Sequence, residues 1–323
     1  MIEYTQLNFK IWSRLGSCGA FGIAVMELAS INDNVLALTS DLCTFSGLDR
    51  FRETYTDRFY NFGIAEQNMV GVASGLAKEG FIPFATTYAT FATMRCADQI
   101  KVNMGYMKLG VKLVGLTSGL SVGILGPTHM CIEDLALMRS IPNIVILSPA
   151  DCTETVKATI AAAEINTPVY FRLTGAMNNP MVYKEDYNFE IGKAITLKEG
   201  NNISIIATGT MVYNSLKAAE LLEQQGISVK VINMHTIKPI DKKAIEEACN
   251  SQLIVTVEEH SRIGGLGSSI AEELAPKKNK PPQLIIGISD EYKHAGEYQH
   301  MIEQYGLEPE QILEKILSVY KGE

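Results

Sequence analysis

The chain has 323 residues and a formal charge of -8, with 46% apolar and 20% charged residues. This composition is close to the globular average and excludes disordered, collagen-like and coiled-coil chains. The acidic balance, with a pI of about 5.3, disfavours nucleic acid and anionic membrane surfaces as partners, so small-molecule substrates are favoured. A chain of this length suits two domains of about 150 residues each.

The few cysteines and histidines give no sign of a metal site or a disulfide framework. The six cysteines have no CxxC spacing, and five histidines form no HxxEH-type pair. No metal site made by this chain alone is therefore expected. Because no stretch approaches 18 uninterrupted apolar residues and the N-terminus lacks a signal pattern, we expect a cytoplasmic protein that does not enter a membrane.

In the first half of the chain, short β-rich runs alternate with helical patterns. This rhythm is typical of βα units around a parallel sheet. Strands are expected at 35–38, 82–85, 111–116, 144–147 and 169–172, and helices at 8–30, 64–78, 88–104, 131–140 and 151–164.

A polar, turn-rich stretch at 174–202 interrupts this rhythm and predicts a connector, with the domain boundary near residue 187. Two domains, 1–187 and 188–323, follow from that boundary. In the second domain, strands are expected at 203–207, 229–232, 253–257 and 284–288, and helices at 211–225, after the N-cap Asp241, and at 268–275.

Three common catalytic or phosphate-binding motifs are absent from the sequence, namely GxGxxG, GxxxxGK[ST] and GxSxG. The GGLG at 264–267 is interpreted as a tight turn before a helix. The most informative segment is instead 60–78, in which Glu66 stands in the first turn of a small, apolar helix. Considered alone, Glu66 is a carboxylate that stabilises a helix N-terminus.

The surrounding blocks resemble the transketolase family of thiamine-diphosphate enzymes. In the first half these blocks are FGIAEQNM, IPFATTYATFATMRCADQI and GPTHMCIEDLALMRSIPNIVILSPAD, and in the second half VINMHTIKPID and VTVEEHSRIGGLGSSIAE. The resemblance covers nearly the whole chain. It implies an α/β fold of two domains, a parallel-sheet pyrimidine-binding domain followed by a transketolase C-terminal domain.

The resemblance implies that Glu66 hydrogen-bonds the aminopyrimidine of thiamine diphosphate, which helps that ring take the proton from the thiazolium carbon. The aromatic pair Tyr88 and Phe91 matches the family's residues around the pyrimidine, with Phe91 as the better stacking residue. Asp41 and Ile64 fall at further cofactor positions. Without the family match, the two aromatic residues would be interpreted as core packing and Asp41 as a turn residue.

In full-length transketolases a preceding domain binds the diphosphate through Mg2+ with a GDG motif, and no GDG occurs here. The chain therefore resembles the C-terminal subunit of a split transketolase. An N-terminal subunit with GDG and a later Asn is implied as the partner that holds Mg2+, in an α2β2 assembly. The β subunit of the 2-oxoacid dehydrogenases has a similar layout but lacks the GPTH-type segment.

Three residues stand where the family binds substrate, namely Arg14, His129 and Arg172. Arginine pairs well with a phosphate, so an anionic substrate is expected, although each of the three could have a packing role instead.

Other family positions depart from the pattern. The usual serine after Asp41 is Phe45, with Ser46 beside it, a histidine is replaced near Thr117, and the usual aspartate is Leu125. Losing a partner for a buried hydroxyl costs on the order of 1 to 3 kcal/mol, so a less hydroxylated substrate than the usual ketose phosphates is expected.

The function that we expect is transfer of a two-carbon ketol unit from a ketose donor to an aldehyde acceptor, by an enzyme subunit active only with its partner. Two alternatives stay open from the sequence. One is a thiamine-dependent acyloin or acyl-transfer enzyme, including a decarboxylating one. The other is a non-catalytic regulatory subunit, which the presence of Glu66 and the aromatic pair argues against.

Overall fold

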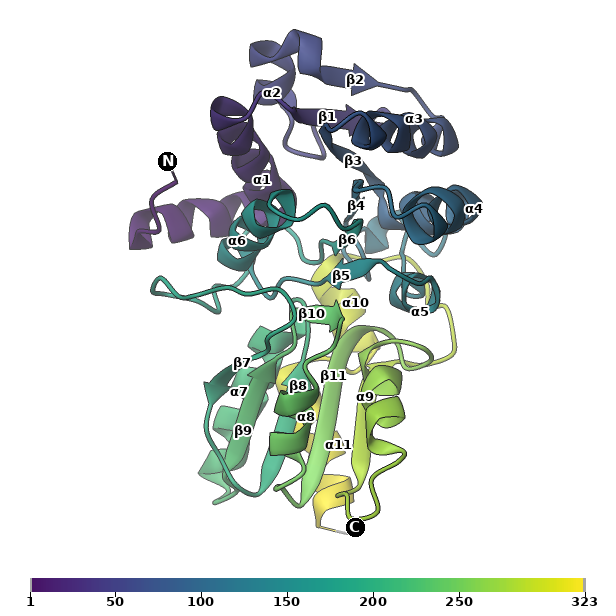
Figure 1. Ribbon diagram of the computed structural model, residues 1–323. Helices are drawn as coiled ribbons and strands as arrows, with labels where there is room; N and C mark the ends of the chain where they lie inside the picture. Colours follow the sequence, from purple (N-terminus) through teal and green to yellow (C-terminus); the bar gives the residue numbers. More distant parts are fainter. Residues whose placement is uncertain (1, 322–323) are drawn as a thin grey trace.

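Two sheets, one after the other along the chain, organise the computed structural model, which describes residues 2–321 (Figure 1). The first sheet belongs to the N-terminal half and lies in the upper part of Figure 1, and the second belongs to the C-terminal half. Helices pack against both sheets, so each half is an α/β unit. The predicted fold class, two α/β domains in this order, is confirmed.

The first sheet has seven strands in the order β10-β5-β6-β4-β3-β1-β2. All neighbours are parallel except the β10–β5 pair, which is antiparallel. Its strands are β1 (Val35–Thr39), β2 (Phe59–Asn61), β3 (Ile82–Tyr88), β4 (Lys112–Leu116), β5 (Val145–Leu147), β6 (Val169–Arg172) and β10 (Thr236–Lys238). Four of them are buried along their whole length, β1, β4, β5 and β6, as expected for parallel strands covered on both faces.

The helices of this half are α1 (Gln6–Ile31), α2 (Asp49–Thr54), α3 (Glu66–Lys78), α4 (Ala97–Gln99), α5 (Asp134–Ser140) and α6 (Cys152–Ala163). The sequence predicts one helix over 88–104, but the structure has two π-helical stretches, η2 (Phe91–Arg95) and η3 (Ile100–Tyr106), on either side of α4. π-Helical segments often mark functional sites, and η2 contributes to the site described below.

The longest helix, α1, is apolar and long enough to cross a membrane by length and composition alone. It is instead packed as a core helix, because half of its apolar window is buried, and its Trp12 and Ala24 pack with Val156 of α6. Gly16 interrupts it with a φ of 77°. A Cβ there would lie 2.9 Å from the carbonyl oxygen of Ala176, so the close approach of the loop after β6 requires glycine.

The second sheet has five strands in the order β12-β11-β8-β9-β7, of which only β7 is antiparallel to its neighbour. Its strands are β7 (Ile195–Lys198), β8 (Ile203–Ala207), β9 (Val229–Asn233), β11 (Leu253–Ser261) and β12 (Gln283–Ile288). The helices around it are α7 (Met211–Gln224), α8 (Lys242–Ala248), α9 (Leu266–Leu274), α10 (Tyr298–Gln304) and α11 (Pro309–Tyr320). The predicted N-cap of α8 is confirmed, because Asp241 accepts hydrogen bonds from two backbone N–H groups of that helix.

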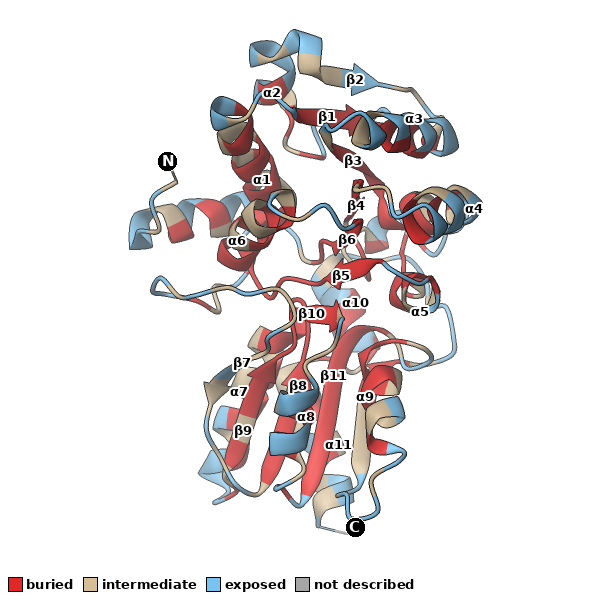
Figure 2. Ribbon diagram, viewed as in Figure 1, coloured by how far each residue is buried: buried red, intermediate tan, exposed pale blue. Residues whose placement is uncertain are grey.

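The two halves share both a sheet and a core. The strand β10 comes from the C-terminal half but pairs with β5 at the edge of the first sheet, as Figure 1 shows between the two units. One hydrophobic cluster also joins Leu135 and Met138 of α5 with Leu266 and Ile270 of α9. Figure 2 shows the buried strands of both sheets in red, with exposed residues mostly on helices and loops. The domain boundary near residue 187 stays a prediction.

A buried lysine makes the stability of the first half dependent on pH. The Lys112 ammonium, on β4, donates to the carbonyl oxygens of Ile165 (2.6 Å) and Thr167 (2.8 Å). Burial lowers the pKa of Lys112 from 10.5 to about 7. Between these values the unfolded state binds more protons than the folded state, so the free energy of unfolding rises with pH, by up to about 1.4 kcal/mol per pH unit.

We therefore expect the wild type to gain stability relative to Lys112→Met as the pH rises from 7 to 9, in urea unfolding at a series of pH values. Lys101→Met is the matched control, because Lys101 is exposed and should add no slope. An identical slope for the wild type and Lys112→Met would contradict the lowered pKa of Lys112.

Candidate active site

The site lies at the carboxyl ends of neighbouring strands of the first sheet, where parallel sheets place ligands. Tyr88 ends β3, and Phe91 follows it in η2. His129 comes from the loop after β4, and Phe45 from the loop after β1. Ring centroids lie 6.0 Å apart for Tyr88 and Phe91, 5.4 Å for Phe91 and His129, 5.9 Å for Tyr88 and His129, and 6.0 Å for Phe45 and Tyr88. These four rings form the aromatic cluster of the site.

Glu66 is the first residue of α3, and its side chain is only 3% exposed. Its Oε1 atom accepts a hydrogen bond of 2.6 Å from Nη1 of Arg95, which is 42% exposed. The same guanidinium lies over the Phe91 ring, 4.0 Å from its centroid. A planar cation thus stacks on Phe91 and donates to Glu66 at the same time.

Sequence reasoning missed Arg95, although it stands four residues after Phe91 in a helical segment, a spacing that places two side chains on one face.

Asp41 contacts the turn that precedes Glu66, and Ile64 lies in that turn. Asp41 has a φ of 57°, and Asn61 holds this turn, because its side-chain oxygen accepts from the Asp41 and Gly63 N–H groups, both at 3.0 Å. Ile64 is 81% exposed, two residues before Glu66. An apolar side chain so exposed is available to a ligand or to another protein chain.

The loop after β4 carries two exposed apolar residues, and it also carries His129 of the aromatic cluster. Ile124 and Leu125 are largely exposed, in the short 3-10 turn η4 (Gly123–Leu125). His129 shares a hydrogen bond of 2.9 Å between its Nδ1 atom and the Thr128 hydroxyl. Thr117, at the start of the loop, turns its hydroxyl back to the Leu116 carbonyl oxygen.

The structure separates the neighbours Phe45 and Ser46. Phe45 is 60% exposed and joins the aromatic cluster through Tyr88. Ser46 is fully buried, where its hydroxyl contacts Thr86 Oγ1 (2.8 Å) and donates to the Leu42 carbonyl oxygen (2.7 Å). Ser46 therefore holds the loop after β1 in place, and Phe45 is the residue that faces the site.

Arg14 lies just before the kink in α1, and its side chain is exposed. The neighbouring Ser13 and Ser17 donate to the carbonyl oxygens of Asn179 (2.6 Å) and Thr174 (2.8 Å), so this part of α1 is attached to the loop after β6. The same loop reaches the loop after β4, because the Gly175 N–H donates to Ser121 Oγ at 2.9 Å. Arg14 thus stands at the edge of the sheet where the site lies.

Arg172 corrects one expectation. Its side chain is 1% exposed, its Nε atom donates to both Asp134 carboxylate oxygens at 3.0 and 2.9 Å, and its Nη2 atom donates to the Glu259 carbonyl oxygen at 2.8 Å. Tyr170 also donates to Asp134, at 2.7 Å. A guanidinium so enclosed and paired cannot reach a substrate, so Arg172 holds the two halves together instead of binding a phosphate.

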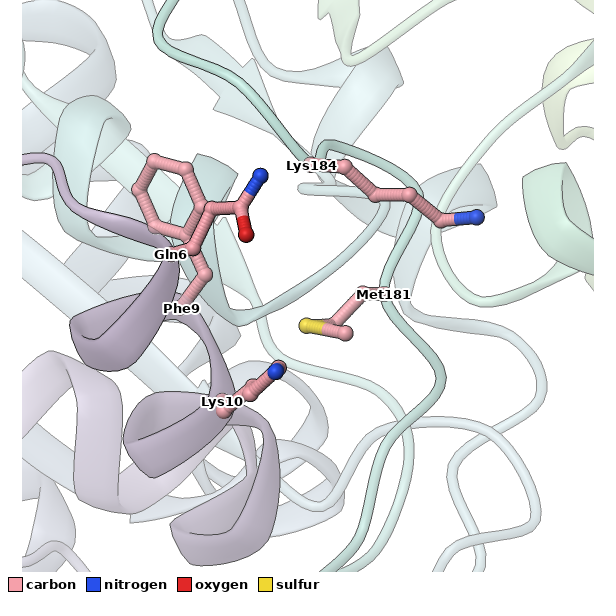
Figure 3. Close-up of a pocket in the computed structure, with 5 residues that line it drawn as sticks. All are labelled: Gln6, Phe9, Lys10, Met181 and Lys184. Atoms are coloured by element: carbon pink, nitrogen blue, oxygen red, sulfur yellow. The ribbon is translucent and has the colours of Figure 1, made fainter.

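A separate cavity lies away from these residues. It has a volume of about 240 Å³ and is lined by Gln6, Phe9, Lys10, Met181 and Lys184, between the start of α1 and the connector (Figure 3). None of the predicted site residues lines it. Within residues 2–321, no group of three or more His, Cys, Asp or Glu side chains is arranged to hold a metal ion.

Comparison with known proteins identifies both halves. Residues 17–178 match the pyrimidine-binding domain of transketolase, and residues 192–312 match the transketolase C-terminal domain. The chain belongs to the transketolase family. Members of this family depend on thiamine diphosphate, and the predicted family resemblance is confirmed.

Similar transketolase-family proteins are C-terminal sections or subunits. A putative transketolase C-terminal section from Methanocaldococcus jannaschii is 38% identical over 94% of this chain and 96% of that protein. One subunit of the apulose-4-phosphate transketolase of Phocaeicola vulgatus is 37% identical over 94% of this chain and 96% of that protein. A solved split-gene transketolase, described as an inactive beta4 tetramer, matches with a TM-score of 0.88 and 38% identity over 95% of this chain and 99% of that one.

The residues around Glu66 fit the ring of thiamine diphosphate. The Arg95 guanidinium, which is flat and carries N–H donors, stacks on Phe91 and donates to Glu66. An aminopyrimidine ring has the same flat shape and can make the same two contacts. The Glu66 carboxylate and the Phe91 ring thus offer one hydrogen-bonding group and one flat face to the same partner, which is the chemistry that an aminopyrimidine ring requires.

Proposed function

We propose that this transketolase-family chain is the catalytic C-terminal subunit of a two-component enzyme that transfers a two-carbon ketol unit from a ketose phosphate to an aldehyde. The observation that carries the proposal is the buried Glu66 carboxylate beside the Phe91 ring, with a flat cation seated on both. A regulatory subunit would have no need of a buried carboxylate paired with a cation that lies over an aromatic ring.

When bound, thiamine diphosphate supplies a nucleophilic carbon that takes up the two-carbon unit. Glu66 holds a proton shared with a ring nitrogen, and its position at the start of α3 keeps the carboxylate fixed. Phe91 and Tyr88 would exclude water from one side of the ring. Ile64 lies two residues before Glu66 and Asp41 donates its N–H to Asn61 in the preceding turn, so both would help to complete that pocket, and His129 would face the substrate side.

The diphosphate and Mg2+ are expected to be held by a partner. The sequence has no GDG motif, and the described residues include no suitable group of metal-binding side chains. The related apulose-4-phosphate protein is named as one subunit of its enzyme, and a related beta4 tetramer is described as inactive. Both support an N-terminal partner subunit, in an α2β2 assembly in which the exposed Ile64 would meet the partner. The cytoplasmic location stays a prediction.

The experiment that tests this proposal is ketol transfer by the chain copurified with the GDG-containing subunit of its native cell. The assay contains thiamine diphosphate, Mg2+, xylulose 5-phosphate and ribose 5-phosphate. Turnover that requires both subunits supports the proposal. Turnover of a 2-oxoacid in place of the ketose would favour an acyloin or acyl-transfer enzyme. Turnover by the assembly that does not depend on thiamine diphosphate would favour a regulatory subunit.

The apolar residues of the pocket predict a preference for a substrate with fewer hydroxyl groups. Phe45 contacts Tyr88 of the aromatic cluster, Leu125 is exposed in the loop that carries His129, and neither side chain offers a hydrogen bond. Leu125→Asp is expected to raise kcat/KM for xylulose 5-phosphate by about tenfold, since one hydrogen bond to a hydroxyl is worth roughly 1 to 2 kcal/mol.

The matched control for this prediction is Leu125→Asn, which also adds a polar group but no charge. Steady-state kinetics with both variants measure the effect. Unchanged kcat/KM in both, or a wild type already as efficient as ordinary transketolases, would show that the apolar pocket does not set the preference.

A further inference from the structure

Near the end of strand β11, in the C-terminal domain, three successive side chains are buried, namely Glu258, Glu259 and His260. Buried charged residues are costly unless they are paired or hydrogen-bonded, so each should have a definite partner. Glu258 stays within its own domain, where it accepts from the N–H groups of Leu266 (2.6 Å) and Gly267 (2.8 Å) at the start of α9. The other two side chains cross to the first domain.

Glu259 joins three separate elements. Its Oε1 atom accepts from the N–H of Leu120, in the loop after β4, at 2.6 Å. Its Oε2 atom accepts from the hydroxyls of Thr210, at the start of α7, and of Tyr298, at the start of α10, both at 2.7 Å. Burial raises the pKa of Glu259, and the nearby Arg172 and these donors oppose that rise.

The contact with Leu120 fixes the base of the loop that faces the site. Gly119 and Cys131 close this base through two backbone hydrogen bonds, of 2.8 and 3.1 Å. Gly119 has a φ of 69°, and a Cβ there would collide with the Glu259 Oε1 atom. The carboxylate therefore packs directly against the Gly119 backbone. A second contact from the C-terminal domain follows at once, since the Gly296 N–H donates to the Gly123 carbonyl oxygen at 3.1 Å.

His260 holds the first turn of α5, which follows the same loop along the chain. Its Nε2 atom accepts from the N–H groups of Leu135 (3.1 Å) and Ala136 (3.4 Å), and its Nδ1 atom donates to the Ser261 carbonyl oxygen. This pattern requires a neutral ring, which agrees with burial lowering the pKa of His260 to about 4. The C-terminal domain thus contacts the base of the loop that presents His129 to the aromatic cluster, and also the helix that follows this loop.

We infer that Glu259 is a positioning residue, which acts from the C-terminal domain to fix loop 117–131 and so the substrate side of the active site. Its effect on catalysis rests on the proposed function, because Leu125 and His129 must face a substrate there. A buried carboxylate that accepts a hydrogen bond from a backbone N–H group holds that group strongly in place. A small displacement of a group that faces the substrate can lower the reaction rate by a large factor.

The test compares Glu259→Ala, Glu259→Gln and Glu258→Ala in the full chain, by hydrogen–deuterium exchange of peptides that cover 117–131. Glu259→Ala is expected to speed exchange of this segment by about ten- to a hundredfold, the range for loss of a hydrogen bond to a charged group. Glu259→Gln keeps an acceptor for Leu120 and should stay within about threefold of the wild type. Glu258→Ala is the matched control, since its carboxylate contacts α9 and not the loop.

The same variants are then assayed with the partner subunit. Glu259→Ala is expected to raise KM for the donor at least tenfold, with the affinity for thiamine diphosphate unchanged and with rescue by Glu259→Gln. Unchanged exchange in Glu259→Ala, or equal acceleration in Glu258→Ala, would overturn the positioning role. If the wild-type complex transfers no ketol unit, the proposed function fails, while the exchange comparison still decides whether Glu259 fixes the loop.

Discussion

Glu66→Gln is expected to lower cofactor-dependent ketol transfer by the assembled enzyme at least a hundredfold. Glutamine keeps the size of the side chain and can still contact Arg95, but it cannot hold the shared proton, and a positioned acid or base contributes about 10² to 10⁴ in rate. The measurement is steady-state transfer with saturating thiamine diphosphate and Mg2+.

The control for Glu66→Gln is Glu79→Gln, which removes the same charge from an exposed position at the other end of α3. It should keep full activity. A Glu66→Gln enzyme that retains more than a tenth of wild-type activity would show that this chain does not supply the acid–base group, and would restore the regulatory subunit as an interpretation.

Arg172→Leu is expected to lower the free energy of unfolding by about 3 to 5 kcal/mol, because it leaves the buried Asp134 without its cationic partner. The double variant Arg172→Leu/Asp134→Leu removes both charges and should recover much of that loss. Denaturant unfolding of the three proteins measures the effect.

This experiment also separates the structural role of Arg172 from the substrate role predicted by the sequence. A substrate-binding arginine would raise KM on replacement and leave stability unchanged. Full stability of Arg172→Leu would therefore contradict the buried ion pair.

Most of the α/β rhythm could be predicted from the sequence, because buried parallel strands such as β1 and β8 are short apolar runs with turn residues at their ends. The exceptions are strands without such a signal. β10 has three residues, and its only sheet partner is β5, nearly 90 residues earlier in the chain. No local pattern encodes a pairing of that kind.

Glu66 and Phe91 could be proposed from the sequence because a single position carries each role, and those roles stay predictions, whereas contacts shared by two distant residues could not be proposed. Arg95 reaches Glu66 across 29 positions, and Asp134 meets Arg172 across 38. A sequence shows that an arginine ends a strand, but not whether its guanidinium is enclosed or exposed. Likewise, only the structure separates the inward Ser46 from the outward Phe45.

The contact of Arg95 with Glu66 and Phe91 bears on how the chain folds without a ligand. An unpaired buried carboxylate would oppose that folding. In the isolated chain the Arg95 guanidinium pairs with the carboxylate and lies over the Phe91 ring, so Glu66 has a cationic partner before any cofactor binds. Under the proposed function, binding of the cofactor ring would displace this guanidinium, which is 42% exposed, from Glu66 and Phe91.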